Sequence, residues 1–218
     1  IFQVRRRTPA AALERSVQTK RPIVLASCVV LLLSALGTAL ARTLAVPKDY
    51  HTIGRAIHVA DEGDTVLLAP GIYKETVDLQ ERMSLIGWKR DETVIVGKEN
   101  RPVIMGANHT LVRNLTIKAG SVGIRCEGKL MTIEENVITE NRESGVHALI
   151  SLPVIRNNII VRNDWTGIYC EAVRSLNTAI EHNILAENKY SGISLAGRCE
   201  LLIQNNIIAN NGQYAIWV

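Results

Sequence analysis

The sequence predicts an all-β protein: a single-stranded right-handed parallel β-helix, in which short strands stack coil upon coil. The first observation is a repeat, because an asparagine recurs at intervals of 22, 22, 25 and 23 residues from residue 114 onward. The second is composition, since each repeat holds short β-branched runs separated by polar corners. Such units are too short to contain a helix and predict a solenoid of strands.

The chain opens with a segment typical of export signals. Lys20 and Arg21 precede residues 22–41, which carry no charge and end in Ala39-Leu-Ala41. A basic region, an apolar region and a small-residue site together predict a signal peptide within a leader of residues 1–41, cleaved after Ala41. The alternative is an uncleaved membrane anchor, because about 20 apolar residues can span a bilayer.

Residues 42–64 are expected to form a linker and a short capping helix. Ile53, Ala56, Ile57 and Ala60 recur at helical spacing, and Thr52 is suited to the N-cap. A helix at this place would close the open end of the solenoid and shield its strand edges from other chains.

Residues 65–218 are expected to form the β-helix. Its early coils are less regular, with apolar β-branched runs at residues 65–71, 72–77, 84–87, 93–97 and 102–106. The clear repeats follow, and the chain stops at Val218 within a repeat. We therefore expect further coils beyond this end.

Two columns of asparagine are predicted to line the corners of the stacked coils. A side-chain amide both donates and accepts hydrogen bonds, so a stacked column can satisfy itself along the solenoid axis. The first predicted ladder is Asn114, Asn136, Asn158, Asn183 and Asn206, and the second is Asn141, Asn163, Asn188 and Asn211.

Charge and cysteine content exclude several classes of function. The net charge of +4 comes from the leader, since residues 42–218 hold 19 basic and 20 acidic residues, so no nucleic acid is expected as a partner. The five histidines are scattered, and no metal site or cofactor is predicted. Three cysteines follow the leader, without a disulfide pattern. A monomer is expected.

The segment from Val46 to Leu79, VPKDYHTIGRAIHVADEGDTVLLAPGIYKETVDL, resembles a known family. Together with SLIGWKRDETVIVG and the asparagine-rich repeats, it is similar to the pectin lyase-like right-handed β-helix proteins, particularly the secreted NosD-like repeat group. The resemblance implies the fold and an envelope or extracellular setting. It implies a particular function only weakly, because unrelated activities share this cap motif.

The motifs of the family's best-known enzymes are missing from this sequence. Pectin methylesterases carry a phenylalanine-containing catalytic segment, and the only phenylalanine here is Phe2. Polygalacturonase-like hydrolases use clustered aspartates with a Gly-His-Gly motif, and neither feature occurs. Pectate lyases use calcium-binding carboxylates, and no like-charged cluster is evident.

A candidate binding wall nevertheless follows from strand alternation. Each repeat has a small residue followed by an apolar residue, as in Gly123-Ile124 and Gly145-Val146. If the apolar residue faces the core, the side chain that follows it should point outward. These outward positions, with two aromatic residues of the adjoining corner, are Arg125, His147, Tyr169 and Trp217, with Trp165 and Tyr190. They could stack on sugar rings, abstract a proton, or decorate a strand without further role.

The sequence as a whole predicts an exported carbohydrate-interacting or scaffold module of the envelope or extracellular space, without an evident active site. Its expected partner is a polysaccharide or another envelope component, with membrane contact only through an uncleaved leader. Two alternatives remain. One is a polysaccharide lyase or hydrolase, and the other is a NosD-like periplasmic accessory protein for copper-enzyme maturation.

Overall fold

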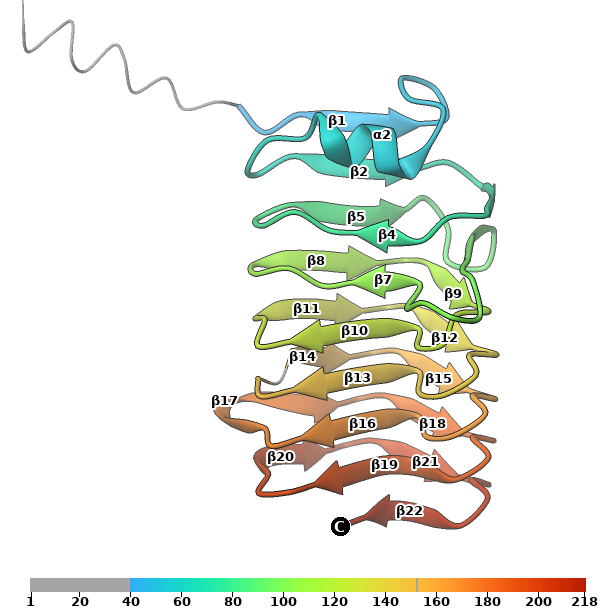
Figure 1. The fold of residues 1–218 in the computed structure, drawn as a ribbon, viewed down its shortest axis with the longest axis vertical. Helices are drawn as coiled ribbons and strands as arrows, with labels where there is room; N and C mark the ends of the chain where they lie inside the picture. The colour runs from blue at the N-terminus through green and yellow to red at the C-terminus, as the bar shows by residue number, and fades with distance from the viewer. Residues whose placement is uncertain (1–39, 152) are drawn as a thin grey trace, which may run out of the picture. The chain divides into compact units, whose positions relative to one another are not determined.

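The computed structural model describes residues 40–151 and 153–218, which belong to one compact unit. The chain winds through successive coils, each stacked on the last (Figure 1). The predicted leader, apart from residues 40 and 41, lies outside the described residues. Within the described part of the chain, no helix is long and apolar enough to cross a membrane.

Three parallel sheets run along the solenoid, and each coil after the first contributes one strand to each sheet. Sheet A has the order β1 (Thr43–Val46), β2 (Thr65–Leu68), β5 (Ser84–Gly87), β8 (Thr110–Arg113), β11 (Met131–Glu134), β14 (Val154–Arg156), β17 (Arg174–Glu181) and β20 (Glu200–Gln204). Every strand pairs with the equivalent strand of the next coil, about 4.8 Å away. This is the parallel β-helix that the repeat predicts.

Sheets B and C complete the coil. Sheet B consists of β3 (Gly71–Tyr73), β6 (Thr93–Val96), β9 (Thr116–Lys118), β12 (Val137–Thr139), β15 (Ile159–Val161), β18 (Ile184–Ala186) and β21 (Ile207–Ala209). Sheet C consists of β4 (Val77–Asp78), β7 (Ile104–Met105), β10 (Ile124–Glu127), β13 (Val146–Leu149), β16 (Ile168–Glu171), β19 (Ser191–Ala196) and β22 (Tyr214–Trp217).

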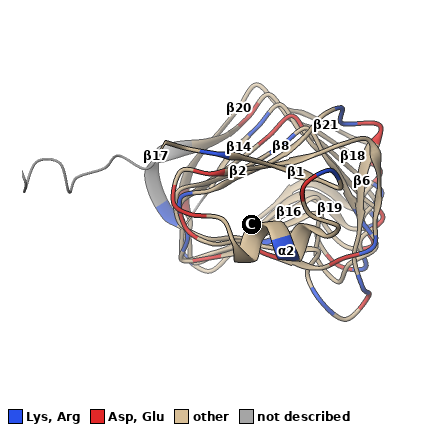
Figure 2. Cartoon of the chain, turned by 90° about the horizontal axis from the view of Figure 1, so that it is seen from above, with Lys and Arg blue, Asp and Glu red and all other residues tan. Residues whose placement is uncertain are grey.

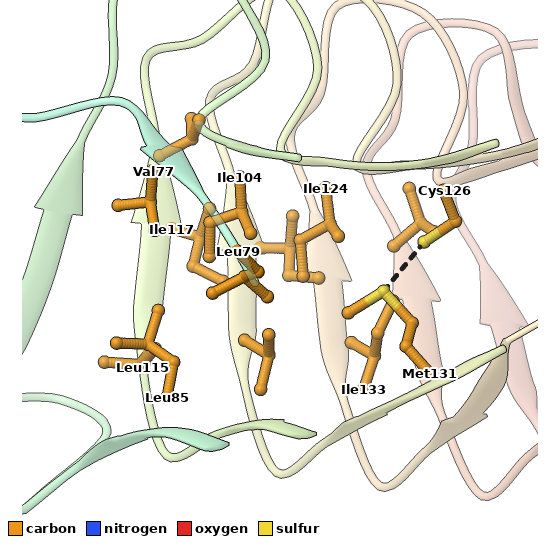
Figure 3. Close-up of a cluster of buried hydrophobic side chains, with 14 of the residues drawn as sticks. Val77, Leu79, Leu85, Ile104, Leu115, Ile117, Ile124, Cys126, Met131 and Ile133 are labelled. Atoms are coloured by element: carbon orange, nitrogen blue, oxygen red, sulfur yellow. Dashed lines mark hydrogen bonds between the residues drawn. The ribbon is translucent and has the colours of Figure 1, made fainter. Parts of the chain in front are cut away.

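The core lies inside the coils, because alternate side chains of each strand point inward. In sheet C the inward column of Ile124, Val146 and Ile168 is fully buried. Apolar side chains from successive coils pack against one another in this interior (Figure 3). Cys126 lies there with its thiol 3.1 Å from the sulfur of Met131, and burial raises the pKa of that thiol to about 12.

The solenoid begins earlier than the sequence predicts. Residues 42–64 were expected to be a linker and a helix, but β1 within them pairs with β2 and forms the edge of sheet A. The carboxylate of Asp64 holds this start in place by accepting bonds from the backbone and guanidinium of Arg42. The prediction of a linker was wrong because this strand forms only by pairing with residues more than 20 positions later, Thr43 with Thr65.

The helix itself is α2 (Ile53–His58), with Thr52 as its N-cap accepting a bond from the Arg55 amide. It follows β1 at the place where later coils have a strand of sheet C, and it contacts β1, β2 and β4. Seen down the solenoid axis, α2 lies on the same side as β16 and β19 (Figure 2). Ile53 and Ala56 are fully buried, so the helix covers the core at this end.

Asparagine ladders join the coils at two corners. In the inner coils, a side-chain amide such as that of Asn136 or Asn158 donates to a carbonyl of the preceding coil and to the side-chain oxygen of the next asparagine. The next oxygen also accepts the backbone N–H of the preceding asparagine. The first ladder contains Asn136, Asn158, Asn183 and Asn206, and the second contains Asn141, Asn163, Asn188 and Asn211.

Asn114 does not belong to the first ladder, contrary to the sequence-based prediction. The partner of Asn136 in the preceding coil is the buried Leu115, whose N–H bonds to the Asn136 side chain. Val112 pairs with Ile133, an offset of 21 residues, whereas Ile124 pairs with Val146, an offset of 22. The later coil therefore has one residue more than the earlier coil between its strands of sheets B and C. Asn114 itself takes the left-handed conformation, with φ of 56°.

Candidate functional site: the outer face of sheet C

The outward residues of sheet C form one column along the solenoid. The strand register pairs Arg125 with His147, His147 with Tyr169, Tyr169 with Ser194, and Ser194 with Trp217. Their neighbours in sequence, such as Ile124 and Ile168, face the core. The alternation that buries the core therefore presents these side chains on the outer surface.

The corner before sheet C adds aromatic residues beside this column. The Trp165 N–H bonds to the carbonyl of Glu143, and the Tyr190 N–H bonds to the carbonyl of Trp165. These bonds stack the three residues in successive coils, next to the outward column of the sheet. The two parts of the predicted wall thus come together through the regular coil geometry.

The rings form a continuous series of contacts. Ring centroids lie 4.8 Å apart for His147 and Tyr169, 4.9 Å for Tyr169 and Trp165, and 6.3 Å for Trp165 and Tyr190. We call this surface the aromatic wall. It comprises His147, Trp165, Tyr169, Tyr190, Tyr214 and Trp217, the last two with centroids 5.8 and 6.5 Å from Tyr190.

Part of this aromatic surface remains open to solvent. Trp165 is 37% exposed, Trp217 38% and Tyr214 46%. Ser194, by contrast, is fully buried although it occupies the outward column, and its hydroxyl bonds to those of Ser191 and Thr166. Neighbouring side chains therefore cover the column at this coil, while the tryptophans keep exposed ring surface.

Arg125 lies at the end of the wall without belonging to the ring contacts. Its guanidinium is 3.7 Å from Glu127 on the same strand. Of the six residues predicted from the sequence, five contact one another through their rings, and Arg125 neighbours His147 by strand register.

Three further residues of this surface were not predicted from the sequence. Tyr214 contacts Tyr190, Glu171 shares the outward face with Tyr169, and Glu143 lies directly before Trp165 in the corner column. Alternation along β16 could have identified Glu171, because it follows Tyr169 by two residues. Tyr214 begins β22 two residues before Ile216, so alternation places it with the inward residues, and Glu143 belongs to a corner, where no simple alternation applies.

His147 is neutral near pH 7. Its side chain is 15% exposed, and its Nε2 is buried without a hydrogen-bond partner in the described structure, 3.9 Å from a carboxylate oxygen of Glu171. Burial lowers the pKa of His147, and the positive charge of Arg125 lowers it further, against the opposing effect of nearby glutamates.

Tyr169 also stays uncharged near neutral pH. Burial raises the pKa of its phenol, and the neighbouring Glu171 raises it further. The wall can therefore offer neutral ring faces and neutral hydrogen-bonding groups to a ligand. Its formal charges come from Arg125 and the surrounding glutamates.

Another hollow lies on sheet A, away from the predicted wall. It has a volume of about 470 Å³ and is lined by Leu111, Met131 and Val154, with the ion pair of Glu134 and Arg156 at its side. Among the described residues, no group of three or more His, Cys, Asp or Glu side chains is arranged to hold a metal ion.

A family model described as "Right handed beta helix region" matches residues 102–218. The chain belongs to this family of right-handed β-helix proteins. The match covers the regular repeats and gives the hand of the solenoid. No curated protein sequence matches the chain.

Two solved structures resemble the chain at low identity. Pectin methylesterase PemA from Erwinia chrysanthemi is 14% identical with a TM-score of 0.36, over 72% of this chain and 54% of that one. The AlgE6 A-module, a mannuronan C-5 epimerase from Azotobacter vinelandii, is 16% identical with a TM-score of 0.33, over 73% and 71%. The chain thus spans about half the length of PemA.

Proposed function

We propose that this β-helix protein is an exported carbohydrate-binding module of the envelope or extracellular space, and that the aromatic wall is its binding surface. The observation that carries the proposal is the series of ring contacts from His147 on β13 to Trp217 on β22. It follows the solenoid axis and keeps its tryptophan faces partly exposed.

The physical basis is the dual character of these side chains. Tryptophan and tyrosine present a broad apolar face together with a polar N–H or O–H group. A sugar ring likewise has apolar C–H faces and hydroxyls at its edge, so it can stack on the ring while bonding to polar neighbours. A solenoid repeats such positions coil after coil and suits an extended ligand.

A scaffold role without ligand would leave the exposed rings unexplained. Clustered apolar surface exposed to solvent often marks an interaction site, whereas single exposed residues need no explanation. Export and the NosD-like assignment remain predictions from the leader and the resemblance.

Affinity electrophoresis of the whole chain tests the proposal. Native gels contain soluble neutral, acidic or amino polysaccharides, and at least one should retard the protein. Trp165→Ala should weaken binding about 2- to 10-fold, as loss of about 0.5–1.5 kcal/mol of ring stacking implies. Trp88→Ala is the matched control, because Trp88 is 64% exposed and lies outside the wall.

Each outcome has a defined meaning. Retardation that Trp165→Ala weakens and Trp88→Ala leaves intact supports the proposal. No retardation by any polymer, or equal effects of both variants, contradicts it. If the bound polymer is shortened and His147→Ala abolishes the shortening, the wall belongs to an enzyme instead of a binding module.

A further inference from the structure

We infer that the aromatic wall selects a polysaccharide with free amino groups, a positively charged glycan, over one with carboxylates. The inference rests on the proposed function, because the rings make this surface a candidate binding site. The charged groups beside the rings then determine which class of glycan fits.

Two glutamates flank the ring series without a basic partner. Glu143 forms no ion pair among residues 40–151 and 153–218 and is exposed in the corner column. Glu171 is 46% exposed, and the only basic side chain within ion-pair distance in the same residues is His147. Because His147 is neutral near pH 7, it does not compensate this charge.

Two basic residues close to the wall are paired, and one, Arg142, has no ion-pair partner among the described residues. Arg125 lies 3.7 Å from Glu127, and Lys189 lies 2.8 Å from Asp164. Each of these pairs contributes no net charge. Arg142, next to Glu143 in the same corner and exposed, offsets one of the two glutamate charges. The surface around Trp165 and Tyr169 therefore keeps one net negative charge, from Glu143, Glu171 and Arg142 together.

Their positions place this charge where a stacked sugar would lie. Glu171 projects from the same strand face as Tyr169, and Glu143 directly precedes Trp165 in the corner stack. The two ring centroids are 4.9 Å apart. A sugar on these rings would thus lie near both glutamates.

The charge beside the rings predicts a different affinity for each of three kinds of glycan. An ammonium group on a stacked sugar would supply the glutamates with a positive partner, while a uronate carboxylate would meet a like charge. A neutral glycan would gain stacking alone. The wall should therefore prefer amino sugars to neutral sugars, and neutral sugars to uronates.

The test compares three probes on the whole chain at about pH 6.5, where an ordinary glutamate is ionised and His147, whose pKa is lowered, is mostly neutral. They are a soluble glucosamine polymer, its N-acetylated oligomers and polygalacturonate. Binding to the glucosamine polymer should be about 5-fold tighter than to the acetylated oligomers, the size expected for a partly exposed ion pair. It should weaken as salt is added, because salt screens exposed charges.

The variant Glu143→Gln/Glu171→Gln removes both charges with little change in shape. It should lose the preference for the glucosamine polymer, about 5-fold or more, and keep its affinity for the acetylated oligomers. Glu81→Gln is the matched control, because Glu81 is exposed and lies between β4 and β5, outside the wall. A thermal unfolding curve for each variant verifies the fold.

The outcomes separate the inference from the function on which it rests. Binding of the acetylated oligomers that needs Trp165 but shows no preference for free amino groups overturns the inference and leaves the proposed function standing. An equal effect of Glu81→Gln also overturns it, since the attraction would then come from overall charge. If no probe binds, the proposed function fails first.

Discussion

At the residue scale, the structure shows single side chains that hold long stretches of the coil. Asp64 is the clearest case, with a side chain only 2% exposed. Its carboxylate accepts bonds from the Arg42 N–H at 2.7 Å, the Arg42 guanidinium at 2.6 Å and the Asp61 N–H at 2.9 Å. It thereby fixes the first strand of sheet A against the second.

This carboxylate should make the stability of the protein depend on acid pH. The bond with Arg42 lowers the pKa of Asp64 from 3.8 to about 2. Because the folded-state pKa is depressed, the stabilisation is complete above pH 3.8 and is lost as the pH falls from there to about 2.

Asp64→Asn measures the effect. We expect it to reduce the free energy of unfolding at pH 7 by about 1–3 kcal/mol, since it removes charge-assisted hydrogen bonds. The difference from the wild type should shrink below pH 3.8. Urea unfolding at several pH values provides the measurement, and a difference that is constant down to pH 2 contradicts the expectation.

At the element scale, α2 depends on other segments because six residues are too few for a stable helix on their own. Its buried face packs on the first coil, and Glu75 accepts the N–H groups of Ile53 at 3.0 Å and Gly54 at 3.1 Å. A carboxylate at a helix N-terminus accepts hydrogen bonds from the free backbone N–H groups and is attracted to the positive end of the helix dipole.

Glu75→Ala should therefore loosen the helix locally. We expect amide hydrogen exchange in residues 53–58 to accelerate about 5- to 30-fold, which corresponds to about 1–2 kcal/mol of lost local stability. Exchange in β10 and β13 should stay unchanged, and these strands serve as the internal control. Unchanged exchange in residues 53–58 would show that packing alone holds α2.

At the scale of the whole molecule, the solenoid depends on the bonds that join its coils. Each coil contacts only its neighbours, so a residue that bonds to both adjacent coils holds three coils together. Asn163 is such a residue, because it bonds to Asn141 on one side and to Asn188 on the other.

A ladder asparagine and an asparagine outside the ladders should respond differently to the same substitution. Asn163→Ala leaves buried backbone and side-chain groups unpaired in two coils, and should lower the free energy of unfolding by about 2–4 kcal/mol. Asn100→Ala should cost less than about 0.5 kcal/mol, because Asn100 is exposed and belongs to neither ladder. Chemical denaturation measures both, and equal losses would contradict a stabilising role of the ladder.

Much of this architecture follows from local sequence patterns. Repeats such as Ile124, Val146 and Ile168 predict an inward column, and the residue after each predicts the outward wall. The helix is likewise expected from Ile53, Ala56 and Ile57. These features depend on periodicity within short segments, which the chain carries irrespective of its distant contacts.

Errors arise where periodicity breaks. The even spacing of Asn114 and Asn136 suggested one ladder, but the irregular corner before β10 shifts the register by one residue, and Leu115 takes the ladder position. β1 was missed because a single strand between the leader and the helix has no neighbouring repeat to reveal it. Its pairing with β2 exists only in the folded chain.

By itself, the sequence determined the solenoid, its sheet faces and the outward position of the wall residues, because coil repetition turns sequence spacing into spatial columns. Only the tertiary structure decided which rings touch, that His147 has a buried and unpaired nitrogen, and that Glu143 and Glu171 flank the wall. Those properties depend on how corners and neighbouring coils pack side chains together, and no spacing along the chain encodes them.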